Sequence, residues 1–87
     1  MFHTTTVKRT SMRGTVLTYV LSEPGEETVN SIADDLYHGT GTRKKVFNAV
    51  YDAVSNLRQR GLLYYGDGPN RTNRKLHAVD GAAQCLV

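Results

Sequence analysis

The segment from Val46 to Val79 constrains the fold of this chain more than any other part of the sequence. It reads VFNAVYDAVSNLRQRGLLYYGDGPNRTNRKLHAV. Its first half repeats apolar residues at helical spacing and stops at Gly61, and glycine is the residue that most often ends a helix. Two short runs with strand character follow, over 62–65 and 74–79, on either side of a polar turn rich in glycine and arginine. The segment therefore predicts a long helix followed by a β-hairpin.

The long helix is expected over residues 43–60, with Thr42 as its N-cap. At about 100° per residue, one stripe of this helix is apolar and predicts the face that packs in the core. The stripe comprises Val46, Val50, Ala53, Val54 and Leu57, with Phe47 at its edge. The opposite side is polar and carries Lys44, Lys45, Asn48, Asp52, Ser55, Asn56 and Gln59, with Tyr51 on its flank.

A shorter helix is expected to begin after Ser11, a good N-cap residue. It must end by Ser22 or Glu23, because Pro24-Gly25 follows. Its apolar positions recur at helical spacing: Met12, Val16, Tyr19 and Val20.

A second short helix is expected over residues 31–37, capped by Asn30 and ended by Gly39. Its buried residues are predicted to be Ile32, Ala33 and Leu36. The pair Thr28-Val29 before it is a candidate for a single β-bridge to the hairpin, and Thr40-Gly41 after it is expected to form a turn.

With 87 residues, of which 39% are hydrophobic, the chain is long enough for one core and too short for two. We therefore expect one domain over residues 11–80. The polar, threonine-rich residues 1–10 are expected to form a flexible arm. The tail over 81–87 shows no periodicity, and is expected either to fray or to cover a hydrophobic surface.

Several classes of protein have no support in the sequence. A single cysteine, Cys85, cannot form an internal disulfide, and the histidines at 3, 38 and 77 are too scattered for a zinc site, so no metal or cofactor is expected. No signal peptide and no apolar run approaching the ~18 residues of a membrane span is present, which favours a cytoplasmic protein without membrane contact. No catalytic motif is recognisable, so the chain is not expected to be an enzyme.

Two segments resemble a known family. AVYDAVSNLRQRGLL, over 49–63, resembles the recognition-helix signature of winged helix-turn-helix DNA-binding transcription regulators, and SIADDL, over 31–36, resembles their scaffold helix. The resemblance implies an α+β winged helix-turn-helix fold with three helices and a C-terminal antiparallel wing of two or three strands. One departure is the thirteen residues over 37–49, about twice the number in compact bacterial members. They either lengthen the turn or extend the third helix by about a turn at its N-terminus.

Charge is distributed unevenly along the chain. Residues 43–75 contain eight basic side chains against two acidic ones, whereas residues 23–35 contain five acidic side chains and no Lys or Arg. Positive charge thus gathers on the expected helix and wing, where the phosphate backbone of double-stranded DNA would lie.

The candidate DNA-binding residues follow from this placement. Asn48 carries an amide that can bond both N6 and N7 of adenine, and the basic residues before it can reach guanine or phosphate. Hydroxyl groups on the same side can donate to phosphate, and the basic residues of the wing can reach the backbone or the minor groove. The full set is Arg43, Lys44, Lys45, Asn48, Tyr51, Ser55, Asn70, Arg71, Asn73 and Arg74. The simpler alternative for each is a solvated surface residue, and Asp52 on the same helix would repel phosphate and confine contact to one side of it.

The sequence favours a sequence-specific, double-stranded DNA-binding transcriptional regulator of bacterial, archaeal or viral type. It would act as a repressor or activator by occupying an operator or promoter, as a homodimer formed through the first helix or the terminal segments. The alternative is a winged-helix module for protein contact, such as a small viral inhibitor or an assembly subunit, with no direct role on DNA.

Overall fold

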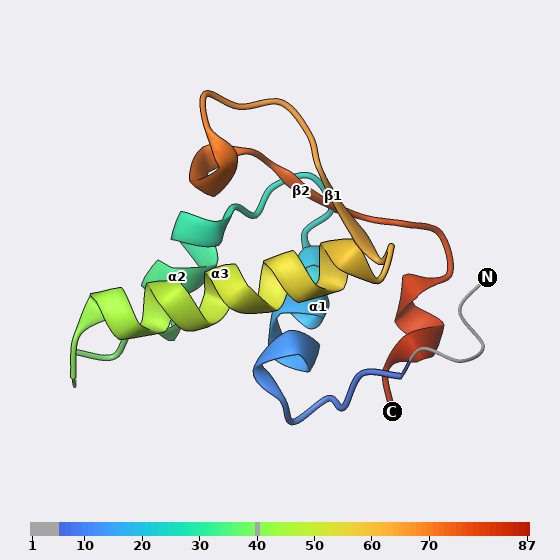
Figure 1. Ribbon diagram of the computed structural model, residues 1–87, viewed down its shortest axis with the longest axis horizontal. Helices are drawn as coiled ribbons and strands as arrows, with labels where there is room; N and C mark the ends of the chain where they lie inside the picture. The colour runs from blue at the N-terminus through green and yellow to red at the C-terminus, as the bar shows by residue number, and fades with distance from the viewer. Residues whose placement is uncertain (1–5, 40) are drawn as a thin grey trace.

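The computed structural model describes residues 6–39 and 41–87, and these form an α+β fold of three helices and a two-stranded antiparallel sheet. Figure 1 shows the long third helix crossing the molecule, with the hairpin projecting beyond the helices. The elements are α1 (Met12–Ser22), α2 (Val29–Leu36), α3 (Arg43–Gln59), β1 (Leu63–Tyr65), the 3₁₀ turn η1 (Arg71–Asn73), β2 (Leu76–Ala78) and the 3₁₀ turn η2 (Ala82–Cys85).

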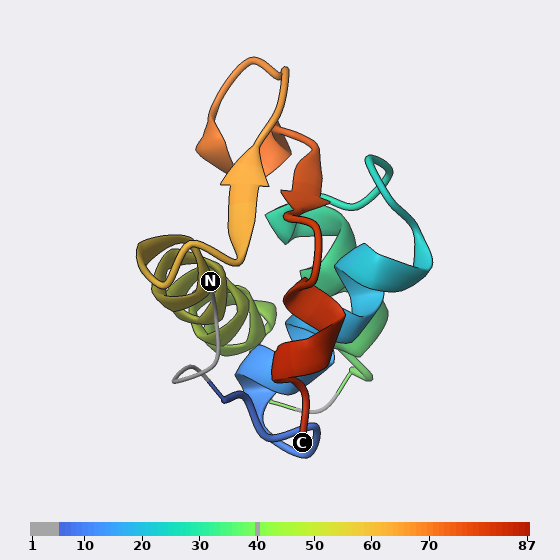
Figure 2. The same cartoon turned by 90° about the vertical axis from the view of Figure 1, so that its right-hand side faces the viewer.

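The core lies where α1 and α2 pack against α3, with the base of the hairpin over one end. Figure 2 views α3 nearly end-on, with α1 and α2 on one side of it and the hairpin above. Of the apolar stripe predicted on α3, four residues are buried, and Val46 and Phe47 pack against the core while remaining partly exposed. The buried set on α3 is Val50, Ala53, Val54 and Leu57.

The ends of α1 and α3 agree with the sequence. The Ser11 hydroxyl accepts a hydrogen bond from the backbone N–H of Gly14 at 3.1 Å, and the Thr42 hydroxyl accepts from Lys45 at 3.3 Å. Gly61, just after α3, has a φ of 78°, in the left-handed region where glycine has no steric penalty. The thirteen residues over 37–49 include the start of α3, so that residues 43–49 extend the helix instead of lengthening the turn.

The predicted start of α2 is wrong. Thr28 is the N-cap, and its hydroxyl and that of Ser31 each accept a hydrogen bond from the other residue's backbone N–H. This reciprocal capping box begins the helix at Val29 and places Asn30 inside the first turn. The predicted bridge of Thr28-Val29 to the hairpin is therefore also wrong. One backbone hydrogen bond, from Leu76 to the carbonyl of Glu27 at 2.8 Å, joins β2 to this region instead.

The end of α2 also differs from the expectation. The helix ends at Leu36, and Tyr37 leaves it with extended backbone. Gly39 does have a positive φ of 81°, but it lies in the connection to α3 rather than at the helix end. Of the predicted turn Thr40-Gly41, Thr40 lies outside the described residues, and Gly41 has a φ of 72°.

The hairpin strands are shorter than predicted. β1 and β2 pair in antiparallel register, with Leu63 opposite Ala78 and Tyr65 opposite Leu76. Residues 66–75 form a long loop between them, here called the hairpin loop. The loop requires glycine at Gly68, because a Cβ there would lie 2.5 Å from Cα of Arg74.

The described part of the expected arm packs against the rest of the fold at Val7. Val7 is buried and forms a parallel β-bridge with Leu86, supported by backbone hydrogen bonds from Val7 to Cys85 at 2.8 Å and from Val87 to Val7 at 2.9 Å. Residues 1–5 lie outside the described part of the chain. The tail over 81–87 is expected either to fray or to cover a hydrophobic surface. In the structure it covers the core with Ala82 and Cys85.

Within the described ranges, no helix combines the length and the apolar character that crossing a membrane requires.

Candidate nucleic-acid interface

A groove runs between α3 and the hairpin loop and encloses about 400 Å³. We call it the α3–loop groove. It brings together predicted site residues that are about twenty positions apart in the sequence. The groove is lined by Phe47, Asn48 and Tyr51 from α3 and by Asn70, Arg71 and Thr72 from the loop.

The helical repeat explains which flank of α3 faces the loop. Phe47 and Tyr51 are one turn apart, and their rings lie nearly parallel at 7°, with centroids 6.3 Å apart. Arg58 follows Tyr51 by seven residues, about two turns, and so lies on the same flank. Its guanidinium carbon lies 4.9 Å from the ring centroid of Tyr65 in β1. This flank therefore presents two aromatic rings and a cation toward the hairpin.

Tyr65 occupies the junction between α3 and the hairpin. Strand alternation leaves Tyr64 exposed on one face and places Tyr65, half-buried, on the face that it shares with the buried Leu63. The Tyr65 hydroxyl oxygen is buried and has no hydrogen-bond partner among the described residues. Burial raises the pKa of Tyr65, as does the neighbouring Tyr51, whereas three arginines, at 58, 71 and 74, lower it. The phenol thus lies in the positive field of arginines from two elements.

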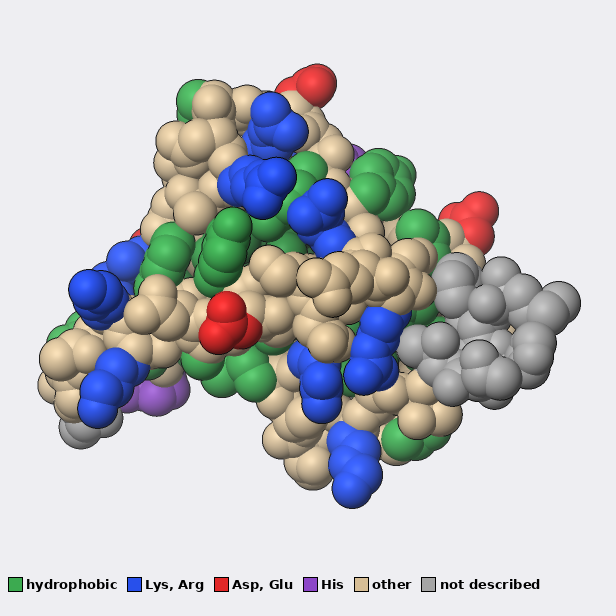
Figure 3. Space-filling view, viewed as in Figure 1, with side chains coloured by type: hydrophobic (Ala, Val, Ile, Leu, Met, Phe, Trp, Pro, Cys, Tyr) green, Lys and Arg blue, Asp and Glu red, His purple; other side chains and the backbone are tan. Residues whose placement is uncertain are grey.

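Most basic side chains of this surface have no acidic partner. Among residues 6–39 and 41–87 the single ion pair joins Arg43 to Asp34, with Nε and Oδ1 2.7 Å apart. Figure 3 shows Lys and Arg side chains gathered on the hairpin above α3, with hydrophobic side chains exposed between them and the helix. The surface combines uncompensated positive charge with an apolar floor.

Arg43 is directed to α2 rather than to the groove. Besides its ion pair with Asp34, its Nη2 donates to the backbone carbonyl of Asn30 at 3.5 Å and to the side-chain oxygen of Asn30 at 3.3 Å. Its guanidinium also lies 5.9 Å from the ring centroid of Phe47. A residue expected to reach DNA is thus engaged in joining the start of α3 to α2.

Two predicted wing residues shape the hairpin loop. The Asn70 side chain caps η1, accepting from the backbone N–H of Asn73 at 3.2 Å and from the Thr72 hydroxyl at 2.9 Å. The Asn73 side-chain oxygen accepts a hydrogen bond from Asn30 at 2.8 Å. Arg71 and Arg74 remain exposed on the same loop.

The remaining predicted residues divide between the two flanks of α3. Lys44 and Ser55 share the helical stripe of Tyr51, on the groove side. Lys45 shares the stripe of Asp52, which lines a separate groove against the start of α1, with Met12 and Arg13. Asp52 is thus not among the residues that line the α3–loop groove, although it lies one turn after Asn48 on the exposed face of α3.

Sequence reasoning missed four residues of this region: Phe47, Arg58, Tyr65 and Thr72. The spacing of seven between Tyr51 and Arg58 was a signal for a shared flank. The strand alternation that separates Tyr64 from Tyr65 was a second signal.

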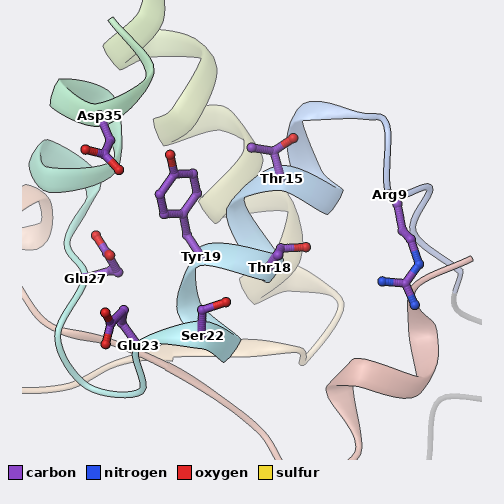
Figure 4. Close-up of a pocket in the computed structure, with 8 residues that line it drawn as sticks. All are labelled: Arg9, Thr15, Thr18, Tyr19, Ser22, Glu23, Glu27 and Asp35. Carbon is purple, nitrogen blue, oxygen red and sulfur yellow. The ribbon is translucent and has the colours of Figure 1, made fainter.

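A groove of opposite charge lies on another part of the surface, between α1 and α2. Figure 4 shows the Tyr19 hydroxyl directed toward Asp35, with the carboxylates of Glu23 and Glu27 nearby and Arg9 apart from them. Burial raises the pKa of Tyr19, and the neighbouring carboxylates of Asp35 and Glu27 raise it further. In the described part of the chain, no group of three or more His, Cys, Asp or Glu residues is placed to hold a metal ion.

Comparison of the chain with known protein families, with curated proteins and with solved structures found no match.

Proposed function

We propose that this chain is a winged helix-turn-helix protein that binds double-stranded DNA and regulates transcription, without catalytic activity. In this proposal α3 is the recognition helix, and the β1–β2 hairpin is the wing. The observation that carries it is the α3–loop groove, where the exposed Arg71 borders the rings of Phe47 and Tyr51 without an ion pair to any described acidic side chain, below further basic side chains on the hairpin (Figure 3). Phosphate contacts of this kind supply most of the affinity of proteins for DNA.

The dimensions of α3 support the same proposal. Its 17 residues span about 25 Å, and a helix of about 10–12 Å diameter fits the major groove of B-DNA, about 12 Å wide. Asn48 is exposed on the solvent side of the groove wall, and its side chain makes no hydrogen bond within the described residues, so its amide is available to a base edge. Lys44, also exposed, lies one turn before it.

A homodimer remains part of the proposal, because one module of this size makes few phosphate contacts. The terminal segments pair with each other inside one chain, which leaves the outer side of α1 as the candidate surface for pairing. Sedimentation with and without a palindromic duplex would test it. A single protomer bound per duplex at saturation would refute the dimer.

The test of DNA binding is a salt titration with a mixed-sequence duplex. Affinity should fall steeply and linearly on logarithmic axes as salt rises, and selection from a random duplex pool should yield a preferred site. Asn48→Ala should relax preference at one base pair, whereas Arg71→Ala should weaken all duplexes alike. No measurable binding at low salt would refute the proposal.

The exposed aromatic floor also favours a second function, binding of a protein partner. Phe47 and Tyr51 are partly exposed, and aromatic residues with arginine are the side chains enriched at protein interfaces. This candidate requires that the chain bind no DNA while Tyr51→Ala abolishes capture of the partner.

A further inference from the structure

The junction of α3 and the hairpin contains a polar group that the fold itself does not satisfy. The Tyr65 hydroxyl is buried without a hydrogen-bond partner, although Tyr64, the next residue in β1, has its side chain in solvent. Buried hydroxyl groups are nearly always hydrogen-bonded, so an unpaired one invites an explanation in terms of a bound group.

The surroundings of this hydroxyl select an anion. Arg58 lies over the Tyr65 ring at 4.9 Å, and Arg71 and Arg74, exposed on the hairpin loop, add to the positive field at the same phenol. None of these three guanidiniums forms an ion pair with a carboxylate of residues 6–39 or 41–87. Like charges gathered at one point repel one another, and a bound anion would relieve that repulsion.

The number and origin of the donors favour a phosphate group over a carboxylate. The positive field at this hydroxyl comes from arginines of two separate elements, α3 and the hairpin loop, which suits an anion with oxygens on several sides rather than a planar group with two. The neighbouring rings of Phe47 and Tyr51 provide an apolar surface for a sugar attached to that phosphate.

We propose that Tyr65, Arg58, Arg71 and Arg74 form a phosphate-binding site at the junction of α3 and the hairpin. The phosphate oxygens accept hydrogen bonds from the Tyr65 hydroxyl and from the guanidiniums. Entry requires the exposed Arg58 side chain to shift from over the ring, a rotamer change of the kind that exposed side chains make within nanoseconds. The identity of the bound group rests on the proposed function, and in that case the group is a backbone phosphate of duplex DNA.

The Arg58 end of the site lies away from the residues assigned to base contact, whereas Arg71 lines the same groove as Asn48. Arg58 follows Lys44 by fourteen residues, about 21 Å along α3. A phosphate held at this end fixes the position of the helix on the duplex, while the N-terminal half of α3 approaches the bases.

The experiment compares four variants in duplex-binding titrations at several salt concentrations. Tyr65→Phe removes only the hydroxyl, and Tyr64→Phe removes the equivalent group on the opposite strand face. Arg58→Gln removes a charge at the site. Arg60→Gln removes a charge beside the site, because the Arg60 guanidinium donates instead to the carbonyl of Thr6. Thermal unfolding of each variant establishes that it folds.

Tyr65→Phe should lower affinity about tenfold, the effect of one hydrogen bond to a charged group, with an unchanged salt slope because tyrosine is neutral. Arg58→Gln should lower affinity and reduce the slope by about one unit. Both controls should bind within about twofold of the unsubstituted chain, as expected for side chains outside the contact.

Inorganic phosphate provides the second arm, with chloride at equal ionic strength as its control. Phosphate should raise the unfolding temperature of the unsubstituted chain and of Tyr64→Phe, but not of Tyr65→Phe. If the chain binds DNA and Tyr65→Phe binds it equally well, the site is wrong and the proposed function stands. If phosphate acts through Tyr65 while no duplex binds, the site stands and the proposed function fails. Binding of neither ligand overturns both.

Discussion

The side-chain amide of Asn30 in α2 donates a hydrogen bond of 2.8 Å to the side-chain oxygen of Asn73 in the hairpin loop. The same amide donates to the backbone carbonyl of Thr72 at 3.3 Å, and the side-chain oxygen of Asn30 accepts from Arg43 at the start of α3. One side chain thus connects α2, α3 and the loop, and it fixes how far the loop stands from the helix.

Asn30→Ala should reduce the free energy of unfolding by about 1 kcal/mol through the lost hydrogen bonds. It should also weaken DNA binding, because the loop loses its support on α2. Urea unfolding and duplex titration measure the two effects. Asn48→Ala is the matched control, since it should alter binding with unchanged stability. Equal stability of the Asn30 variant and the unsubstituted chain would contradict the connecting role.

Lys44→Ala and Lys45→Ala should affect DNA binding unequally although both side chains are exposed. Successive helical residues point about 100° apart, so Lys44 lies with Tyr51 on the groove side and Lys45 with Asp52 on the other. Lys44→Ala should reduce the salt slope by about one unit, and Lys45→Ala by clearly less. Equal slopes for the two variants would mean that DNA contacts the exposed face of α3 between Lys44 and Lys45 rather than its groove side alone.

Val7→Ala should destabilise the chain by about 2 kcal/mol, from two buried methyl groups and the cavity that they leave. Val87→Ala, two residues beyond Cys85 in the same terminal pair, should change stability by less than about 0.5 kcal/mol, because Val87 is 64% exposed. Chemical unfolding of both variants provides the comparison. A stable Val7 variant would mean that the terminal segment is not part of the cooperative fold.

Stability should fall at alkaline pH partly through Tyr65. Burial, with Tyr51 nearby, raises the pKa of Tyr65 above its ordinary value of 10.0, so the folded chain holds the phenolic proton more tightly than the unfolded chain. This contribution is complete below pH 10.0 and is lost as pH rises through the folded pKa. Urea unfolding between about pH 9 and 11 should show a shallower loss for Tyr65→Phe than for Tyr64→Phe, which retains the buried phenol. Parallel losses in the two variants would exclude Tyr65 as a source.

The sequence predicts α3 to within a residue at each end because several signals agree there. Thr42 caps α3 and Gly61 follows it. Its apolar residues also recur at helical spacing over enough residues to exclude the alternation of a strand. The start of α2 shows the opposite case. Thr28 and Asn30 are both good N-cap residues, and the choice depends on Ser31, whose hydroxyl completes the capping box, and on partners of Asn30 more than forty residues away.

Non-local contacts also limited the prediction of the site. Periodicity identified the residues on the surface of α3, but not which flank meets the hairpin loop. That depends on where the β1–β2 pair sits, and its loop is held by Asn30. The pairing of Val7 with Leu86 had no local signal at all, since neither segment has a repeating apolar pattern.

The parallel pairing of Val7 and Leu86 has a mechanical consequence. In a parallel pair, the amino end of one strand and the carboxyl end of the other lie at opposite ends of the ladder. Pulling the chain outward through these two segments therefore shears the pair, and the hydrogen bonds of Val7 and Val87 resist together instead of opening one by one. Stretched between these segments, the molecule should yield abruptly, at a force set by the terminal pair, before its helices bear tension.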